Sequence, residues 1–189
     1  MKYILPTILL SAAAYFTSGL STEPAPALQV RSAETCGDPA FALPLYRIFQ
    51  PAVPARAYEL DVTVVTAEIA QAGWTLERIS AMAFPSQQES TVRFYHLGNG
   101  AGQSNFWTIN TTELNAALQE GYSIVASDIT YIYPTQICGS VPFYRASGSA
   151  NKDNVYTTSE SEYLQFIAEG FVDMGIAGYV LPLNVVQCD

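Results

Sequence analysis

Charged residues are scarce in this chain. They make up 13% of its 189 residues, about half the usual share, and the 17 acidic residues outnumber the eight Lys and Arg. The net charge of −9 argues against binding to nucleic-acid backbones, which requires clustered basic residues. A surface poor in charge but rich in Tyr, Asn, Ser and Thr favours neutral polar ligands such as glycans. A soluble surface without a ligand would have the same composition.

Residues for metal and nucleophilic chemistry are also few. There is one histidine, His96, and neither a C-x-x-C pair nor a Cys/His cluster, so the sequence gives no support for zinc. A hydrolytic triad would need His96, but no G-x-S-x-G elbow occurs, and we interpret His96 as a structural or surface residue. A glycosidase needs two carboxylates across a cleft, whereas Glu160 and Glu162 are explained by a helix start. We therefore expect no catalytic residue, metal or cofactor, with a small glycan hydrolase as the alternative.

Long hydrophobic segments are lacking after the N-terminus. Lys2 precedes the apolar stretch "YILPTILLSAAAYF", and small residues follow it. This pattern predicts a signal peptide over residues 1–20, because Pro6 and the short run disfavour a membrane anchor. A Pro/Ala-rich leader over 21–35 and a folded domain over 36–189 would follow. We expect a secreted, extracellular protein without membrane contact after cleavage.

The folded part is rich in internal repeats. Three sets of landmarks recur at a period of about 49 residues: Tyr46, Tyr95 and Tyr144; Gly73, Gly121 and Gly170; Pro85, Pro134 and Pro182. They define three units, over about 43–85, 92–134 and 141–182. Each unit reads as a strand, a loop, a second strand, a helix and a last alternating strand. Hydrophobic residues make up 49% of the chain, which is enough to form a core. We therefore predict one α+β domain of three β-β-α-β units with pseudo-threefold symmetry.

The helix ends carry local sequence signals. Ser159 with Glu162, and Asn110 with Glu113, have the spacing of a capping box, in which both side chains satisfy backbone N–H groups. Asp61 would cap the first helix without such a glutamate. A glycine followed by an aromatic residue ends each helix, because glycine readily adopts the left-handed conformation after the last turn.

These motifs resemble a known family. "VPFYR", "NVYTTSESE" and "MGIAGYVLP" in unit 3 are similar to a secreted repeat family of unknown function in fungi and bacteria, whose units read like "PLYRLYN…DHFYTTSAAERD…GYTYEGIAGYVYP". The resemblance covers about Cys36 to Pro182. Bacterial units of this kind accompany cell-wall hydrolases, which implies non-enzymatic binding of a cell-wall or extracellular glycan. A secreted interaction or effector-like protein without a small ligand is a further alternative.

The resemblance also indicates candidate ligand-binding residues. The family's Asp-His pair before "FYTT" corresponds to Asp153 and Asn154, followed by Tyr156. Asn105 and Trp107 form a weaker second site in unit 2, and unit 1 has lost the pair. A ring would stack on a sugar while the polar groups bind its hydroxyls. Alternatively both rings belong to the core, since alternate strand residues point inward. We expect Asp153 and Asn154 at a loop edge.

Two covalent features are expected. The resemblance implies a disulfide between Cys36 and Cys138, and in a closed threefold arrangement these cysteines precede equivalent strands; a Cys36–Cys188 bond is the alternative. Cys188 would then be free in a monomer or would pair between two chains. Asn110 begins an N-x-T glycosylation sequon, where a glycan would compete with helix capping.

Overall fold

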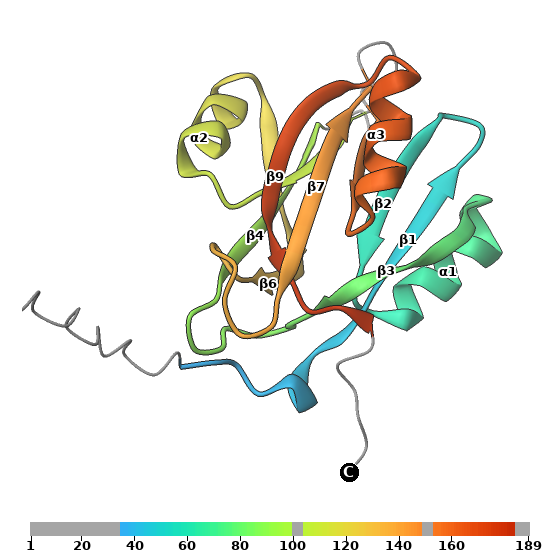
Figure 1. Cartoon of the computed structure of the whole chain (residues 1–189). Helices are drawn as coiled ribbons and strands as arrows, with labels where there is room; N and C mark the ends of the chain where they lie inside the picture. The colour runs from blue at the N-terminus through green and yellow to red at the C-terminus, as the bar shows by residue number, and fades with distance from the viewer. Residues whose placement is uncertain (1–34, 100–103, 149–152, 184–189) are drawn as a thin grey trace, which may run out of the picture. The chain divides into compact units, whose positions relative to one another are not determined.

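The computed structural model describes residues 35–99, 104–148 and 153–183 (Figure 1). The predicted signal peptide, nearly all of the leader, and Cys188 lie outside these residues. Residues 100–103 and 149–152, within the repeat domain, also lie outside them.

Three consecutive units have the same order of elements. Unit 1 contains β1 (Leu43–Gln50), β2 (Ala55–Glu59), α1 (Val62–Ala72) and β3 (Thr75–Ala83). Unit 2 contains β4 (Val92–Asn99), β5 (Asn105–Thr108), α2 (Thr111–Gln119) and β6 (Tyr122–Ile132). Unit 3 contains β7 (Val141–Ser147), β8 (Asn154–Thr157), α3 (Glu160–Ala168) and β9 (Val172–Val180). The α+β fold of three β-β-α-β units is therefore confirmed, and each helix lies beside its own sheet (Figure 1).

Each unit forms its own three-stranded antiparallel sheet, with its first strand in the centre. The strand orders are β2-β1-β3, β5-β4-β6 and β8-β7-β9. Isolated bridges then join the third strands of the units in pairs: Met82 with Leu181, Phe84 with Tyr131, and Tyr133 with Tyr179. These bridges close the three units into a ring, which places every unit against both of the others.

The helix starts follow the sequence prediction in part. The Ser159 side chain accepts a hydrogen bond from the Glu162 N–H at 3.2 Å, and the Asn110 side chain caps α2 in the same way. The reciprocal half of the capping box is not made, so that expectation is wrong. The backbone N–H of Ser159 donates to Thr157 Oγ1 at 3.0 Å, and that of Asn110 donates to Thr108 Oγ1 at 2.9 Å. The glutamate of each box is left for other partners.

The helix ends agree with the prediction. Gly73, Gly121 and Gly170 have φ angles of 73°, 90° and 95°. After α3, the Phe171 N–H donates to the Phe166 carbonyl at 3.0 Å, and the two rings lie 5.0 Å apart. This combination of a left-handed glycine and a following aromatic contact is the expected helix stop.

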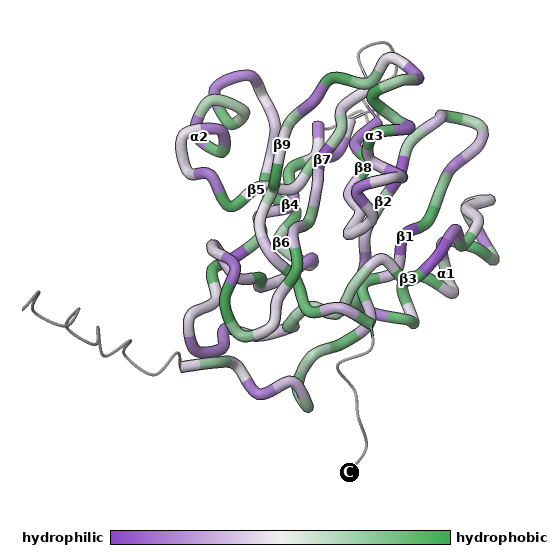
Figure 2. The backbone as a smooth tube through the Cα atoms, in the orientation of Figure 1, coloured by the Kyte–Doolittle hydropathy of each residue, from purple (hydrophilic) through white to green (hydrophobic). Residues whose placement is uncertain are grey.

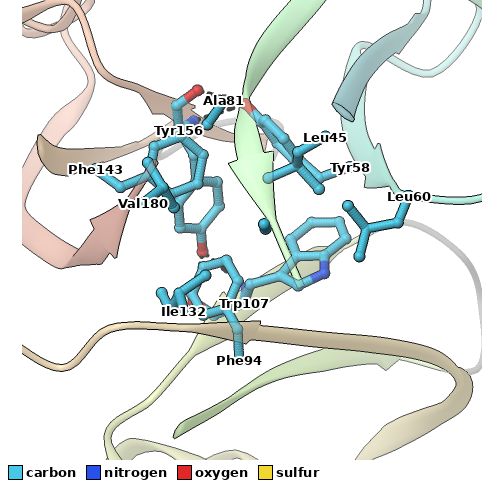
Figure 3. Packing of buried hydrophobic residues seen from close by; sticks show 11 residues of the cluster. Leu45, Tyr58, Leu60, Ala81, Phe94, Trp107, Ile132, Phe143, Tyr156 and Val180 are labelled. Carbon is cyan, nitrogen blue, oxygen red and sulfur yellow. Dashed lines mark hydrogen bonds between the residues drawn. The ribbon is translucent and has the colours of Figure 1, made fainter. Parts of the chain in front are cut away.

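The main core lies where the three units meet. Its largest members are rings at equivalent places on the second strands, Tyr58, Trp107 and Tyr156, which point toward one another (Figure 3). Edge-to-face contacts join them, with ring centroids 5.2 to 5.9 Å apart. Along the backbone, hydrophobic stretches on the strands alternate with hydrophilic ones (Figure 2).

A second buried cluster lies beside the bridged strand ends, and a disulfide closes this region. Cys36 and Cys138 are bonded, with their Cα atoms 5.6 Å apart, as predicted. The Gly37 N–H donates to the buried Tyr133 hydroxyl at 3.1 Å. The bond spans 102 residues and ties the segment before β1 to the segment before β7.

Candidate functional site at the seams between units

The two rings predicted to stack on a sugar lie in the core. Tyr156 is 0% exposed and Trp107 is 1% exposed. The Tyr156 hydroxyl accepts from the Trp107 N–H and donates to the Trp107 carbonyl, both at 2.7 Å. The Tyr58 hydroxyl bridges the backbone of Tyr156 in the same way. The structure therefore supports the core alternative for both rings, because neither presents a face to solvent.

Asp153 lies between units 1 and 3. Its side chain is buried, accepts the Arg56 backbone N–H at 2.8 Å and forms an ion pair with the Arg56 guanidinium. Burial raises the pKa of Asp153 even though Arg56 opposes the shift. Arg56 also forms an ion pair with Glu77 at 2.9 Å. Asp153 lies directly before β8, and its buried side chain joins units 1 and 3.

Asn154 and Asn105 lie together between units 2 and 3. The amide nitrogen of Asn154 donates to the Asn105 carbonyl at 2.9 Å, and its oxygen accepts from Arg145 Nε at 3.1 Å. Asn154 is buried and Asn105 is half-buried. Asn154 holds Arg145 in place and is itself held by the backbone of Asn105. Contact of either residue with a ligand remains a prediction.

Sequence reasoning missed the arginines that connect neighbouring units. Arg145 of unit 3 forms an ion pair with Glu113 of unit 2 at 2.7 Å, and Arg47 of unit 1 pairs with Glu162 of unit 3 at 2.8 Å. Both glutamates come from the capping-box motifs. The sequence signal was present, since the residue after each repeated tyrosine reads Arg47, His96 and Arg145. Its pairing with a helix of another unit required the fold.

We call the contacts between neighbouring units the 1/2, 2/3 and 3/1 seams. Two clefts open at the 2/3 seam, with volumes of about 640 Å³ and about 420 Å³. Arg145 and Glu113 line both clefts. The larger one lies between the start of α2 and strand β9, and its walls include Thr108, Asn110, Met174, Ile176 and Tyr179. The seam therefore presents polar and apolar groups side by side.

Arg145 is rigidly placed in this seam. Its guanidinium lies 4.7 Å from the centre of the Phe106 ring and 5.7 Å from that of Tyr156. Burial alone would lower the pKa of Arg145, but the influence of Tyr156 and Glu113 is larger and the pKa lies above its usual value. Arg145 therefore stays charged and offers hydrogen-bond donors in a fixed position between the two clefts.

The 1/2 seam is built differently. His96 replaces the arginine, and Val64 replaces the glutamate three residues after the helix cap. His96 stacks on Trp107 with ring centres 4.0 Å apart, and its Nδ1 lies 2.9 Å from Asp128 Oδ2 without hydrogen-bond alignment. The same Asp128 oxygen accepts from Trp107 Nε1 at 2.8 Å. The only histidine in the sequence is thus buried against Trp107 and Asp128.

A third cleft, with a volume of about 560 Å³, opens at the 1/2 seam. Asp128 and Glu59 both line it. Burial and three nearby acids, first Asp128 and then Glu68 and Asp61, raise the pKa of Glu59 to about 8. No ion pair among the described residues involves Glu59. This cleft therefore carries a carboxyl group that is mostly protonated at neutral pH.

Other site predictions have plain outcomes. In the described ranges, no group of three His, Cys, Asp or Glu side chains could hold a metal ion. No helix formed by those residues is both long and apolar enough to cross a membrane.

Asn110 is exposed and caps α2 through its Oδ1 atom, whereas a glycan would attach to Nδ2. The cap therefore does not occupy the glycan attachment atom, and glycosylation of the sequon remains a prediction.

Comparison with known proteins places the chain by family. A family model described as "Domain of unknown function (DUF5648)" matches residues 44–181, which include nearly all of the three units. No match was found among curated proteins, and none among solved structures. The chain belongs to the DUF5648 family of domains of unknown function.

Proposed function

We propose that this protein is a secreted, non-enzymatic binding module for cell-wall or extracellular carbohydrate, and that the larger cleft of the 2/3 seam is its site. The observation that carries the proposal is the Arg145–Glu113 ion pair, which lines a cleft of about 640 Å³. Small polar ligands are bound in concave sites where a few placed polar groups lie among apolar ones.

The cleft offers the groups that a glycan would need. Arg145 supplies N–H donors, and Glu113 and Asn110 supply acceptors for hydroxyl groups. The exposed side chains of Met174 and Ile176 form an apolar wall on β9 for the C–H faces of a sugar ring. Because the two charges already form a pair, a neutral ligand is favoured over a charged one.

The predicted residues act in this proposal as supports. Asn154 holds Arg145 through its side-chain oxygen, and Trp107 is among the residues that line the cleft although it is buried. The predicted signal peptide places the module outside the cell, where wall polysaccharides are available. The interaction-protein alternative differs because it requires no sugar at this cleft.

Retention on insoluble polysaccharide tests the proposal. The purified mature domain is passed over chitin, β-glucan and peptidoglycan, and elution is measured for the wild type and for a Met174→Ala/Ile176→Ala variant. We expect the wild type to be retained on at least one of these, and the variant to lose retention about tenfold or more. The two side chains are 43% and 46% exposed, so their truncation leaves the core intact.

A Val172→Ala/Leu164→Ala variant is the matched control. Val172 lies on the same strand and Leu164 on α3, with exposed fractions of 50% and 55%, and neither lines a cleft of the described structure. Equal loss of retention in both variants would contradict the assignment of the cleft. Release of new reducing ends from the polysaccharide would replace the proposal by the hydrolase alternative. Failure of retention on every polysaccharide would favour the interaction-protein alternative.

A further inference from the structure

We infer that the cleft of the 1/2 seam is a second binding site, and that it receives the guanidinium group of an arginine side chain from a protein partner. This site lies between α1 and β6, apart from the cleft proposed for carbohydrate, and the two proposals are independent.

Pseudo-threefold symmetry supplies the first argument. At the 2/3 and 3/1 seams a buried arginine of one unit meets a glutamate on the helix of the preceding unit, in the pairs Arg145–Glu113 and Arg47–Glu162. At the 1/2 seam both partners have been replaced together, by His96 and Val64. The chain thus lacks, at one seam of three, the internal guanidinium that the other two contain.

His96 does not substitute for the missing cation in the cleft. Its Nδ1 faces Asp128, its Nε2 lies 3.3 Å from Asn105 Oδ1, and its ring is stacked on Trp107. It is buried behind these residues and is not part of the cleft wall. The cleft therefore holds acidic groups without a basic side chain from the described chain.

The acidic groups define the electrostatics of the cleft. Glu59 occupies the strand position that Thr108 and Thr157 occupy at the other seams. The charged groups that act on it are Asp128 on β6, Glu68 on α1 and Asp61 at the start of α1, and all are acidic. The unfavourable proximity of these carboxyl groups would be relieved by a cation, because an opposite charge stabilises the ionised form.

The remaining walls fit the aliphatic part of an arginine side chain. Leu43, Pro44 and Val62 line the cleft from unit 1, and Ile129 lines it from unit 2. Long basic side chains pack their methylene groups on apolar surface while the charged end meets a polar group. Two carboxyl groups from different strands also suit the planar fork of a guanidinium better than a single ammonium charge.

The test uses nuclear magnetic resonance with the intact mature domain. The ¹⁵N-labelled protein is titrated with N-acetyl-arginine amide, and with N-acetyl-citrulline amide as the uncharged probe of nearly the same shape. We expect saturable shifts of the backbone signals of Leu60, Asp61 and Ile129 with the arginine probe, and at least tenfold weaker binding of the citrulline probe. Equal binding of both probes would overturn the proposal.

Two protein variants locate the site. Glu59→Gln should weaken binding of the arginine probe about tenfold or more, whereas Glu89→Gln, on an exposed residue outside the cleft, should leave it unchanged. The double variant Val64→Glu/His96→Arg restores the internal pair and should block the probe. If that double variant does not fold, Glu59→Gln alone decides, and unchanged binding by it contradicts the inference.

Two further measurements examine the charge of the site and the chemistry of its ligand. Binding of a cation requires ionised Glu59, so affinity for the arginine probe should rise as the pH rises from about 6.5 to 9, because burial and neighbouring acids raise the pKa of Glu59 to about 8. A flat pH profile would contradict the role of Glu59.

D-glucosamine serves as a sugar that carries an ammonium group, and its affinity is measured by the same titration. If it binds as tightly as the arginine probe, the assignment to a protein partner is overturned.

Discussion

The hydroxyl oxygen of Tyr156 lies 2.7 Å from the backbone nitrogen of Trp107 and 2.7 Å from its carbonyl oxygen. Tyr58 makes the equivalent bridge to the backbone of Tyr156, at 2.6 and 3.1 Å. The third bridge of this ring is missing, because the Trp107 indole donates to Asp128 instead of reaching the backbone of Tyr58. The relationship explains why an aromatic residue with a polar end is repeated at the centre of the domain.

Tyr156→Phe should destabilise the protein by about 2 kcal/mol. It removes one hydroxyl and leaves a buried N–H and a buried carbonyl of Trp107 without that partner. Thermal unfolding measures the effect as a fall in Tm of several degrees. Tyr144→Phe is the control, since Tyr144 is half-buried and stacks on Tyr163 through its ring. Equal Tm values for Tyr156→Phe and the wild type would refute the bridging role.

Glu162→Ala should cost about 2 kcal/mol, because it removes one of the two carboxylates, Glu77 and Glu162, that pair with the buried guanidinium of Arg47. Glu162 also accepts from Arg78 at 3.2 Å and from Thr157 Oγ1 at 2.5 Å. Glu160→Ala, in the same helix turn but exposed, should change the free energy of unfolding by less than about 0.5 kcal/mol. Chemical denaturation of both variants compares them, and similar midpoints would show that the seam ion pair contributes little.

Glu59→Gln should change the pH dependence of stability. The pKa of Glu59 is raised from about 4.5 to about 8 in the folded state, so the folded protein retains a proton that the unfolded chain has released in this range. The stability contributed by Glu59 is therefore fully present below pH 4.5 and is lost as the pH rises through 8. Urea midpoints at pH 5, 6.5 and 8 measure it.

The difference between the wild type and Glu59→Gln isolates this group from the others. The variant should become more stable relative to the wild type as the pH rises, and Glu89→Gln should show no such trend. A difference that stays constant across the range would mean that Glu59 titrates alike in both states.

Gly170→Val should destabilise the fold by about 1–2 kcal/mol through the backbone alone. Gly170 has a φ of 95°, and an added Cβ would meet no atom within 4 Å. A β-branched residue disfavours this left-handed conformation, whereas asparagine tolerates it. Gly170→Asn should thus lose less stability than Gly170→Val in thermal unfolding. The opposite order would contradict the helix-stop account.

Short-range patterns determined much of the fold. The capping residues Asp61, Asn110 and Ser159 and the glycine after each helix act within a few residues along the chain. The 49-residue period shows that this local pattern occurs three times. The three β-β-α-β units could therefore be predicted from the sequence. The disulfide between Cys36 and Cys138 followed from the family resemblance and from their equivalent positions before two repeats.

Tertiary structure alone decided what these residues meet. Both glutamates of the predicted capping boxes pair with arginines of neighbouring units, and Asp153 lies against Arg56, 97 positions earlier in the chain. Spacing within one unit carries no information about the seam formed when three units close into a ring. Burial of Tyr156 and Trp107 is decided for the same reason, because period-two alternation gives a strand two faces and only the packing of the other units determines which one is covered.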